Sequence, residues 1–377
     1  MKISELEPTF VPQREVRVGE VTKIGCAPSD AYLTTNQIEF FYSNGEWRLP
    51  MQSRMDGVVR QGSKNLQVVE MNKLEERDRV VLGSSEDGSE GIYVTSIEKA
   101  LERKGQFGFM TNEVSRERRV DYSRLANILR EARDGDGKII WVVGPAVVHA
   151  GGIESMEWLI RQGYVGSLLA GNALAAHDIE HAMYGTSLGL GDDSRSVPNG
   201  HRKHLEAINT VRTYGSVKQV VEAGLINRGI MYECVRNNIP FVLAGSIRDD
   251  GPLPDTITDS LKSQDAMRAQ IIDGSCVVML ATALHSIAAG NMTPTYRTVG
   301  DEVRSVPIIC VDQEEFTVMK LVDRGTSQAY PVIANARDFL SLLTNELGKQ
   351  ASPNFLTNGS LGLEERILSN YSPKHMV

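Results

Sequence analysis

Residues 144–191 read GPAVVHAGGIESMEWLIRQGYVGSLLAGNALAAHDIEHAMYGTSLGLG, and this stretch decides the fold. An apolar run at 139–143 leads into it and stops at Gly144-Pro145. A second apolar run, at 165–170, stops at Gly171-Asn172. A segment with the spacing of an amphipathic helix follows each run. Strand, glycine and helix, repeated in succession, predict a parallel α/β sheet.

The ends of the predicted strands carry small or polar residues, and these predict a ligand site. Ligands of parallel sheets bind at the carboxyl ends of the strands, where glycine permits close approach and helix N-termini offer free N–H groups. Ordinary βα turns need the same residue types, so a single position is weak evidence, but the set favours a nucleotide-type pocket. The predicted cofactor contacts are Gly144, Pro145, Gly171, Asn172, Ala173, Gly245, Ser246, Thr282, Ser286 and Asp312.

The length of 377 residues favours two domains. Residues 1–120 contain short β-type runs separated by turn signals such as Ser43-Asn44-Gly45, which predict a small, mostly β domain for substrate binding or oligomerisation. Residues 121–350 continue the strand–helix alternation, and we assign them to an α/β domain that carries the nucleotide-type pocket. Residues 351–377 are polar and rich in turn formers, which is typical of a tail.

Composition narrows the class of partner. A formal net charge of −8 argues against a nucleic-acid-binding surface. Neither a signal peptide nor an apolar run of membrane-spanning length is visible, so we expect no membrane partner. The four cysteines form no CxxC pair, which favours a reduced, cytoplasmic setting without a disulfide framework.

Two well-known sequence signatures are absent or incomplete in this chain. No GxGxxG follows the first strand of the α/β part, although Asp312, at a strand end, is well placed to accept ribose hydroxyls. His177 and His181, in the run HDIEH, share one helix face, but a zinc protease needs Glu in the second position. A third ligand, His201 or His204, requires a loop that folds back. We therefore predict no metal, and a helix near the cofactor or a plain surface instead.

Several titratable residues are candidates for chemistry. His285 follows a buried run and suits acid–base catalysis, or else is a hydrogen-bonded structural histidine. Asp249, Asp250 and Asp255 form a carboxylate cluster that suits proton transfer or an ammonium substrate, or else turn chemistry in a solvated loop. Asn112 and Glu113 lie at the expected domain boundary, where helix capping is the simpler interpretation.

Long runs of this chain resemble one family, the NAD-dependent ornithine cyclodeaminases of archaeal and cyanobacterial type, also labelled by their LOR/SDH-like conserved domain. FGFMTNEVSRER (107–118) resembles the segment that joins the family's two domains. The sequence departs from the family at VDQE (311–314), where asparagine and proline usually follow the acid, and its N-terminal region matches less tightly. The matching runs are GPAVVHAGG (144–152), LLAGNALAAHDIE (168–180), MYGTSLG (183–189), VLAGSIRDDGPLPDTITD (242–259), MLATALHSIAAGN (279–291) and VDQEEFTVMKLVDRG (311–325).

The resemblance implies a deoxyhypusine-synthase-like NAD-binding fold that lacks GxGxxG. It implies conversion of L-ornithine to L-proline and ammonia, with a hydride taken from Cα by NAD and later returned to the cyclic imine. It also implies a homodimer or homotetramer. On this basis we expect Arg248 to bind the substrate carboxylate, Asn112 and Glu113 to contact the substrate, and Asp249, Asp250 and His285 to move protons.

Other functions remain open at this point. An NAD(P)-dependent amino-acid or opine-type dehydrogenase, or an imine reductase, would consume or release NADH stoichiometrically. A cyclodeaminase for another diamino acid would share the whole mechanism. A non-catalytic sensor of NAD or an amino acid would bind its ligand without turnover, and a zinc hydrolase would contain metal. The sequence does not distinguish NAD from NADP.

Overall fold

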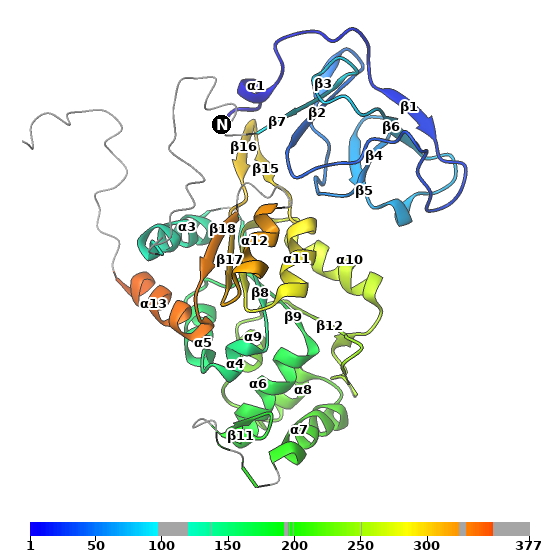
Figure 1. Ribbon diagram of the computed structural model, residues 1–377. Coiled ribbons are helices and arrows are strands. Elements are labelled where there is room, and N and C mark those ends of the chain that lie inside the picture. Colours follow the sequence, from blue (N-terminus) through cyan, green and yellow to red (C-terminus); the bar gives the residue numbers. More distant parts are fainter. Residues whose placement is uncertain are drawn as a thin grey trace, which may run out of the picture.

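The computed structural model describes residues 1–96, 120–135, 137–191, 195, 197–198, 200–249, 251–323 and 329–349. It contains a β-rich region and an α/β region (Figure 1). This confirms the predicted fold class, a small β-rich N-terminal region followed by a parallel-sheet α/β region. Within the described residues, no helix has the length and apolar character needed to cross a bilayer.

The β-rich region, residues 1–96, is built from two small antiparallel sheets, ordered β1-β6-β4-β5 and β3-β2-β7. The predicted turn at Ser43-Asn44-Gly45 closes the β2–β3 hairpin, and both Asn44 and Gly45 have positive φ there, as a tight hairpin turn requires. The elements are α1 (Ile3–Leu6), β1 (Arg17–Glu20), β2 (Ile38–Ser43), β3 (Glu46–Arg48), β4 (Val58–Gln61), β5 (Leu66–Val69), the 3-10 helix η1 (Met71–Lys73), β6 (Arg79–Leu82) and β7 (Ile92–Thr95).

The α/β region is organised by a seven-stranded, wholly parallel sheet with the order β13-β12-β9-β8-β14-β17-β18. Its elements are α3 (Tyr122–Asp134), β8 (Lys138–Val143), α4 (Ala146–His149), α5 (Ile153–Arg161), β9 (Ser167–Gly171), α6 (Asn172–Tyr184), β10 (Thr186–Ser187), β11 (Leu190–Gly191), α7 (Gly200–Tyr214), α8 (Val217–Glu222), α9 (Ile230–Arg236), β12 (Phe241–Ala244), β13 (Thr256–Ile257), α10 (Ser260–Ile271), β14 (Gly274–Leu280), α11 (Ala283–Met292), β15 (Tyr296–Val299), β16 (Glu302–Ser305), β17 (Ile308–Asp312), α12 (Glu315–Asp323), β18 (Ala329–Ile333) and α13 (Ala336–Gly348).

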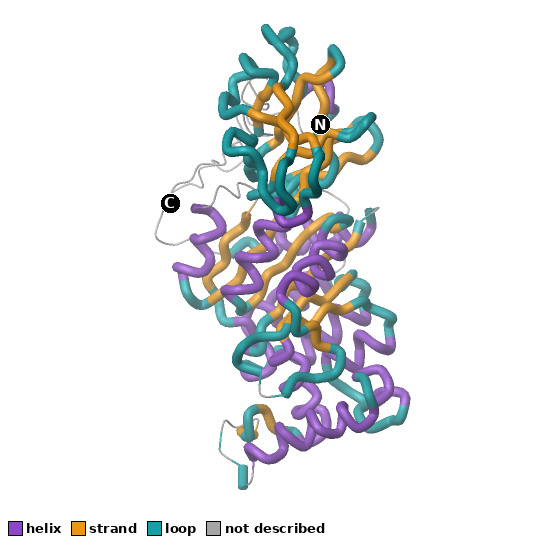
Figure 2. The backbone as a smooth tube through the Cα atoms, turned by 90° about the vertical axis from the view of Figure 1, so that its right-hand side faces the viewer, coloured by secondary structure: helices purple, strands orange, loops and turns teal. Residues whose placement is uncertain are grey.

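Strand β8 shows why the sheet is covered on both faces. Ile139 and Trp141 pack into one apolar cluster, and Ile140 and Val142 pack into the other. Because successive side chains of a strand point to opposite faces, a continuous apolar run requires two coverings. Helices α3–α9 and α13 supply the first and α10–α12 the second, so the helices surround the strands (Figure 2). The buried thiols of Cys276 and Cys310 lie in β14 and β17.

The β-rich region docks at the edge where the parallel strands begin. The hairpin β15–β16 lies between the end of α11 and the start of β17, so it projects from that edge (Figure 1). The backbone N–H of Ile3 donates to the carbonyl of Asp301 at 2.8 Å, and that of Val303 donates to the carbonyl of Met1 at 2.7 Å. Apolar side chains of both regions join one cluster around Phe40.

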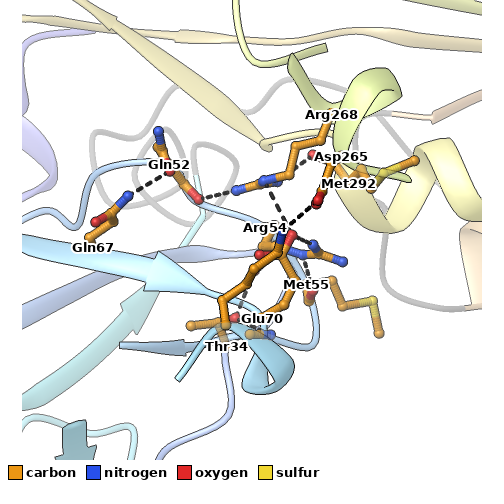
Figure 3. A network of polar contacts seen from close by, with 11 residues as sticks. Thr34, Gln52, Arg54, Met55, Gln67, Glu70, Asp265, Arg268 and Met292 are labelled. Atoms are coloured by element: carbon orange, nitrogen blue, oxygen red, sulfur yellow. Dashed lines mark hydrogen bonds and ion pairs between the residues drawn. The ribbon is translucent and has the colours of Figure 1, made fainter. Parts of the chain in front are cut away.

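A polar network completes this contact (Figure 3). Glu70 forms ion pairs with Arg54 of its own region and with Arg268 of α10, the latter at 3.5 Å. Arg268 also donates to the carbonyls of Gln52 at 2.7 Å and Met292 at 3.1 Å. Burial, together with the neighbouring charge of Arg54, lowers the pKa of Arg268 to about 10 despite Glu70. The single carboxylate of Glu70 thus forms ion pairs with two buried guanidinium groups.

Candidate functional site

The predicted strand-end residues lie along one edge of the sheet. Strand register pairs Val143 with both Ala170 and Leu280, and Gly171 with Ala244. The chain runs from β8 to β9 on one side, and later adds β14 on the other side. The crevice where connections diverge, between β8 and β14, is the position at which open α/β sheets bind ligands.

Gly144 makes the closest backbone contact in this crevice. Its N–H donates to the carbonyl of Leu280 at 2.9 Å, and a Cβ at this position would lie 1.9 Å from the carbonyl oxygen of Ala281. Ala281 has a φ of 53°, a left-handed conformation that is costly for a residue with a side chain. Sequence reasoning missed Ala281, because an alanine after an apolar run carries no signal of its strained backbone. Pro145 follows as the N-cap of α4.

His285 follows β14 and reaches the end of β9, which is two strands away in the sheet order. It lies in the first turn of α11, with Nδ1 3.3 Å from the hydroxyl oxygen of Thr282. A Cβ at Gly171 would lie 3.0 Å from Cε1 of the imidazole. Burial lowers the pKa of His285, while the charge of Asp249 acts in the opposite direction. The imidazole is therefore neutral at neutral pH and is able to accept a proton. Ser286, next in the helix, is buried.

The charged residues of the loop after β12 differ in their exposure and in their hydrogen-bond partners. Asp249 accepts a hydrogen bond from the N–H of Ser246 at 2.7 Å, and Arg248 is exposed. Asp255 instead accepts from the N–H of Val217 at 2.8 Å, at the start of α8, and is half-buried. Asp255 therefore has the structural role that the turn interpretation gave it, whereas Asp249 lies beside His285. Asp250 falls outside the described residues, as do Asn112 and Glu113.

The other predicted cofactor contacts differ in the hydrogen bonds that they already make within the protein. The side-chain oxygen of Asn172 accepts from the N–H of Leu253 at 3.0 Å and from the hydroxyl of Thr256 at 3.1 Å, so it ties the start of α6 to the loop after β12. Ala173 is in the first turn of α6, and Gly245 continues β12 by donating to the carbonyl of Ile257. Asp312 ends β17 half-buried and accepts from the N–H of Glu314 at 3.0 Å.

The run HDIEH is neither a zinc-protease helix nor a plain surface. His177, Asp178 and Glu180 are all buried. Asp178 accepts from the N–H groups of Ile230 at 2.9 Å and Met231 at 2.8 Å, which caps α9. The interpretation as surface was wrong because apolar and small residues occur all round α6, which packs against α4, α7 and α9. A helix without a polar face is the sequence signal of burial.

Comparison with known proteins places this geometry in a family. Residues 123–343 match the model of the family described as arginine dihydrolase ArgZ-like, C-terminal, Rossmann fold, and residues 39–123 match the model of its C-terminal first region. Ornithine cyclodeaminase of Methanocaldococcus jannaschii is 43% identical over 345 residues, which cover 89% of this chain and 78% of the relative.

Two solved structures are similar. The crystal structure of a conserved LOR/SDH protein from Methanococcus maripaludis S2 has a TM-score of 0.79 and 40% identity, covering 89% of this chain and 98% of the other. The ternary complex of AgrE with ornithine and NAD⁺ has a TM-score of 0.58 and 41% identity, covering 91% of this chain and 47% of the AgrE chain.

Proposed function

This chain belongs to the ornithine cyclodeaminase family with an ArgZ-like C-terminal Rossmann fold, and from that premise we propose that it converts L-ornithine to L-proline and ammonia with bound NAD. The observation that carries the proposal is the crevice between β8 and β14, where Gly144 leaves no room for a side chain and the imidazole of His285 lies against Gly171. Support for the ligands comes from the AgrE complex, which contains both ornithine and NAD⁺.

The strand-end residues fit a dinucleotide. The absence of side chains at Gly144 and Gly171 lets Ala281 and His285 pack against these strand ends, and the N-terminus of α6 offers free N–H groups to a phosphate. Asp312 is assigned to the ribose hydroxyls. NAD, when bound, supplies a hydride acceptor for the Cα hydrogen of the substrate and returns that hydride after cyclisation.

The residues beside the crevice supply binding and proton transfer. We assign Arg248 to the substrate carboxylate, because an exposed guanidinium can reorient to make a bidentate contact. His285 accepts a proton from the substrate amine, and Asp249 stabilises the imidazolium that results. Asp250, Asn112 and Glu113 keep their proposed roles in proton transfer and substrate binding.

Product analysis with L-ornithine and substoichiometric NAD⁺ tests the proposal. Many molecules of proline and ammonia per NAD, with little net NADH, are expected. NADH formed one-for-one with an imino or keto acid would instead identify a dehydrogenase. Turnover confined to lysine or diaminobutyrate would move the substrate to another diamino acid, and ligand binding without any turnover would indicate a sensor.

A variant tests the role of His285 within the same assay. His285→Ala is expected to lower turnover by about 1000-fold, the scale of a lost general base, while NAD binding persists. His181→Ala is the matched control, since His181 lies in α6 near its C-terminal end and has no assigned role in the crevice. Undiminished turnover in His285→Ala would remove this residue from the mechanism.

A further inference from the structure

Three imidazoles and one carboxylate gather where α4, α6 and α7 meet, at the end of the α/β region remote from the β-rich region (Figure 1). Nδ1 of His204 lies 3.0 Å from Oε2 of Glu180, and Nδ1 of His177 lies 3.6 Å from the same oxygen. The rings of His149 and His204 each lie 4.7 Å from the ring of His177. The fold thus brings His204 back onto α6, which the sequence prediction had treated as an unmet requirement.

Uncharged hydrogen-bond donors fix the position of the Glu180 carboxylate. Its Oε1 accepts from the hydroxyl of Thr186 and the N–H of Gly189, both at 3.0 Å, and its Oε2 accepts from the N–H of Leu188 at 3.1 Å. The side chain is fully buried, and in the described part of the chain its ion-pairing partners are the two histidines alone. A buried carboxylate without Lys or Arg requires another source of positive charge.

The surroundings of His177 indicate what supplies this positive charge. Its side chain is 8% exposed, and among the described residues its Nδ1 is buried without a hydrogen-bond partner. A buried imidazole nitrogen without a partner is costly unless a further group occupies the adjacent space. One ring nitrogen of His177, one of His204 and one oxygen of Glu180 lie within 4.8 Å of one another.

We propose that His177, Glu180 and His204 bind one Zn²⁺ ion. In a tetrahedral site with bonds of about 2.0–2.1 Å, ligand atoms lie about 3.3 Å apart. Two of the three pairs lie at 3.0 and 3.6 Å, and all three ligand atoms lie within 4.8 Å of one another. Two imidazoles and one carboxylate are a ligand set that zinc accepts. The backbone and hydroxyl donors on Glu180 are the outer contacts that orient such a ligand.

The fourth position is open to solvent beside His149. That residue is exposed, with its Nδ1 2.8 Å from the hydroxyl oxygen of Ser187, and the His204 side chain is 24% exposed. Solvent and a metal ion therefore have a route to the cluster. The ion joins α6 to α7, one turn and more beyond the N-terminal end of α6, so it would hold these two helices together.

Metal binding by the purified full-length chain tests the proposal. The protein is stripped with a chelator and titrated with ZnCl₂ by calorimetry, and cobalt substitution is followed by visible absorption. One Zn²⁺ per chain and the bands of tetrahedral cobalt are expected. Addition of ZnCl₂ is also expected to raise the midpoint of thermal unfolding.

Substitutions at His204 and His181 test whether zinc binds at this cluster. His204→Gln should weaken zinc binding by at least about 100-fold and abolish the thermal shift, because first-shell loss exceeds the 10–100-fold of an outer-shell change. His181→Gln, on the same helix but outside the cluster, should bind as the wild type does. Should His204→Gln misfold, His177→Asn replaces it. A wild-type chain that takes up no stoichiometric zinc, or a His204→Gln chain that binds it equally well, overturns the proposal.

Discussion

The two ends of the parallel sheet have different residues and different tasks. Where the strands begin, the β-rich region covers the sheet with apolar side chains and with the Glu70 network, whose two arginines are buried. Where the strands end, Gly144 meets Ala281 in a left-handed conformation, and His285 faces Gly171. The first end is built mainly from apolar contacts and buried ion pairs, and the second contains the strained backbone of Ala281.

This difference indicates how the fold separates stability from chemistry. Strained backbone and an uncharged imidazole persist only where surrounding structure holds them in place, and they are typical of sites that bind ligands. Buried ion pairs and apolar contacts between regions mainly set how firmly those regions associate. Changes at the two ends should therefore produce separable effects on ligand binding and on unfolding.

The largest effect is expected from Gly144→Ala at the cofactor end. The new Cβ would overlap the carbonyl oxygen of Ala281, which lies 1.9 Å away and belongs to backbone, so the crevice must distort. We expect NAD binding to weaken by at least about 1000-fold and turnover to become undetectable, since displacements of about 1 Å already cost about 100-fold. Calorimetry with NAD⁺ and the proline assay measure both.

Gly348→Ala is the control for that substitution, because a Cβ at the end of α13 meets open space. It should leave binding and turnover at wild-type values. Normal NAD affinity in Gly144→Ala would show that the crevice between β8 and β14 is not the cofactor site.

An effect of intermediate size is expected from Glu70→Gln at the other end. Arg54 and Arg268 would then face each other without their shared carboxylate, and removal of one partner from a buried pair costs about 3 kcal/mol. Urea unfolding should show this loss in the free energy of unfolding. Turnover per folded molecule should not change, because the network lies at the contact with the β-rich region, where the strands begin.

The control for Glu70→Gln lies in the same contact. Asp265 pairs with Lys73 at 2.5 Å, but both side chains are more than 40% exposed. Asp265→Asn should therefore cost less than about 1 kcal/mol. Equal losses of unfolding free energy in Glu70→Gln and Asp265→Asn would contradict the view that burial makes the ion pairs of Glu70 more stabilising than an exposed pair.

The sequence predicted the edge where the parallel strands end better than the edge where they begin. Strand-end residues follow continuous apolar runs, and register then carries Gly144, Gly171 and Thr282 to one edge without further information. Docking of the β-rich region depends on the β15–β16 hairpin, which the sequence analysis did not predict. Its strands are short, and its apolar residues Tyr296 and Val303 pack against another region. Such long-range contacts leave no local periodicity.

The sequence identified His177 and His204 as candidates but did not predict that they lie together, for a related reason. His177 and His181 are neighbours in helical spacing, whereas the partner that the fold provides for His177 comes from α7. Spacing identifies ligands within one element but not those brought together by two packed helices. Asp255 illustrates the converse, because a carboxylate that stands close to Asp249 in sequence is taken up by the start of α8.

The smallest effect, and one specific to the covered end, concerns Glu39 in β2. Its Oε1 accepts from the N–H and hydroxyl of Thr35 and from the hydroxyl of Tyr32, but in the described structure its Oε2 is buried without a partner. Burial raises the pKa of Glu39 to about 7, against the effect of these hydrogen bonds. The hydroxyl of Tyr296, from the docking hairpin, also lacks a partner among the described residues. The folded protein therefore holds Glu39 protonated at a pH where the unfolded chain has released the proton.

The sign of the pH dependence follows from this raised pKa. The contribution of Glu39 to stability is complete below the unfolded pKa of about 4.3 and is lost as the pH rises through about 7. Between pH 5 and pH 7, this group alone should lower the free energy of unfolding by about 2 kcal/mol. Glu39→Gln, uncharged at every pH, should remove that slope, whereas Glu46→Gln on the exposed neighbouring strand should retain it. Urea unfolding at several pH values measures the slope, and an identical slope in Glu39→Gln and the wild type would mean that Glu39 is ionised within the covered end.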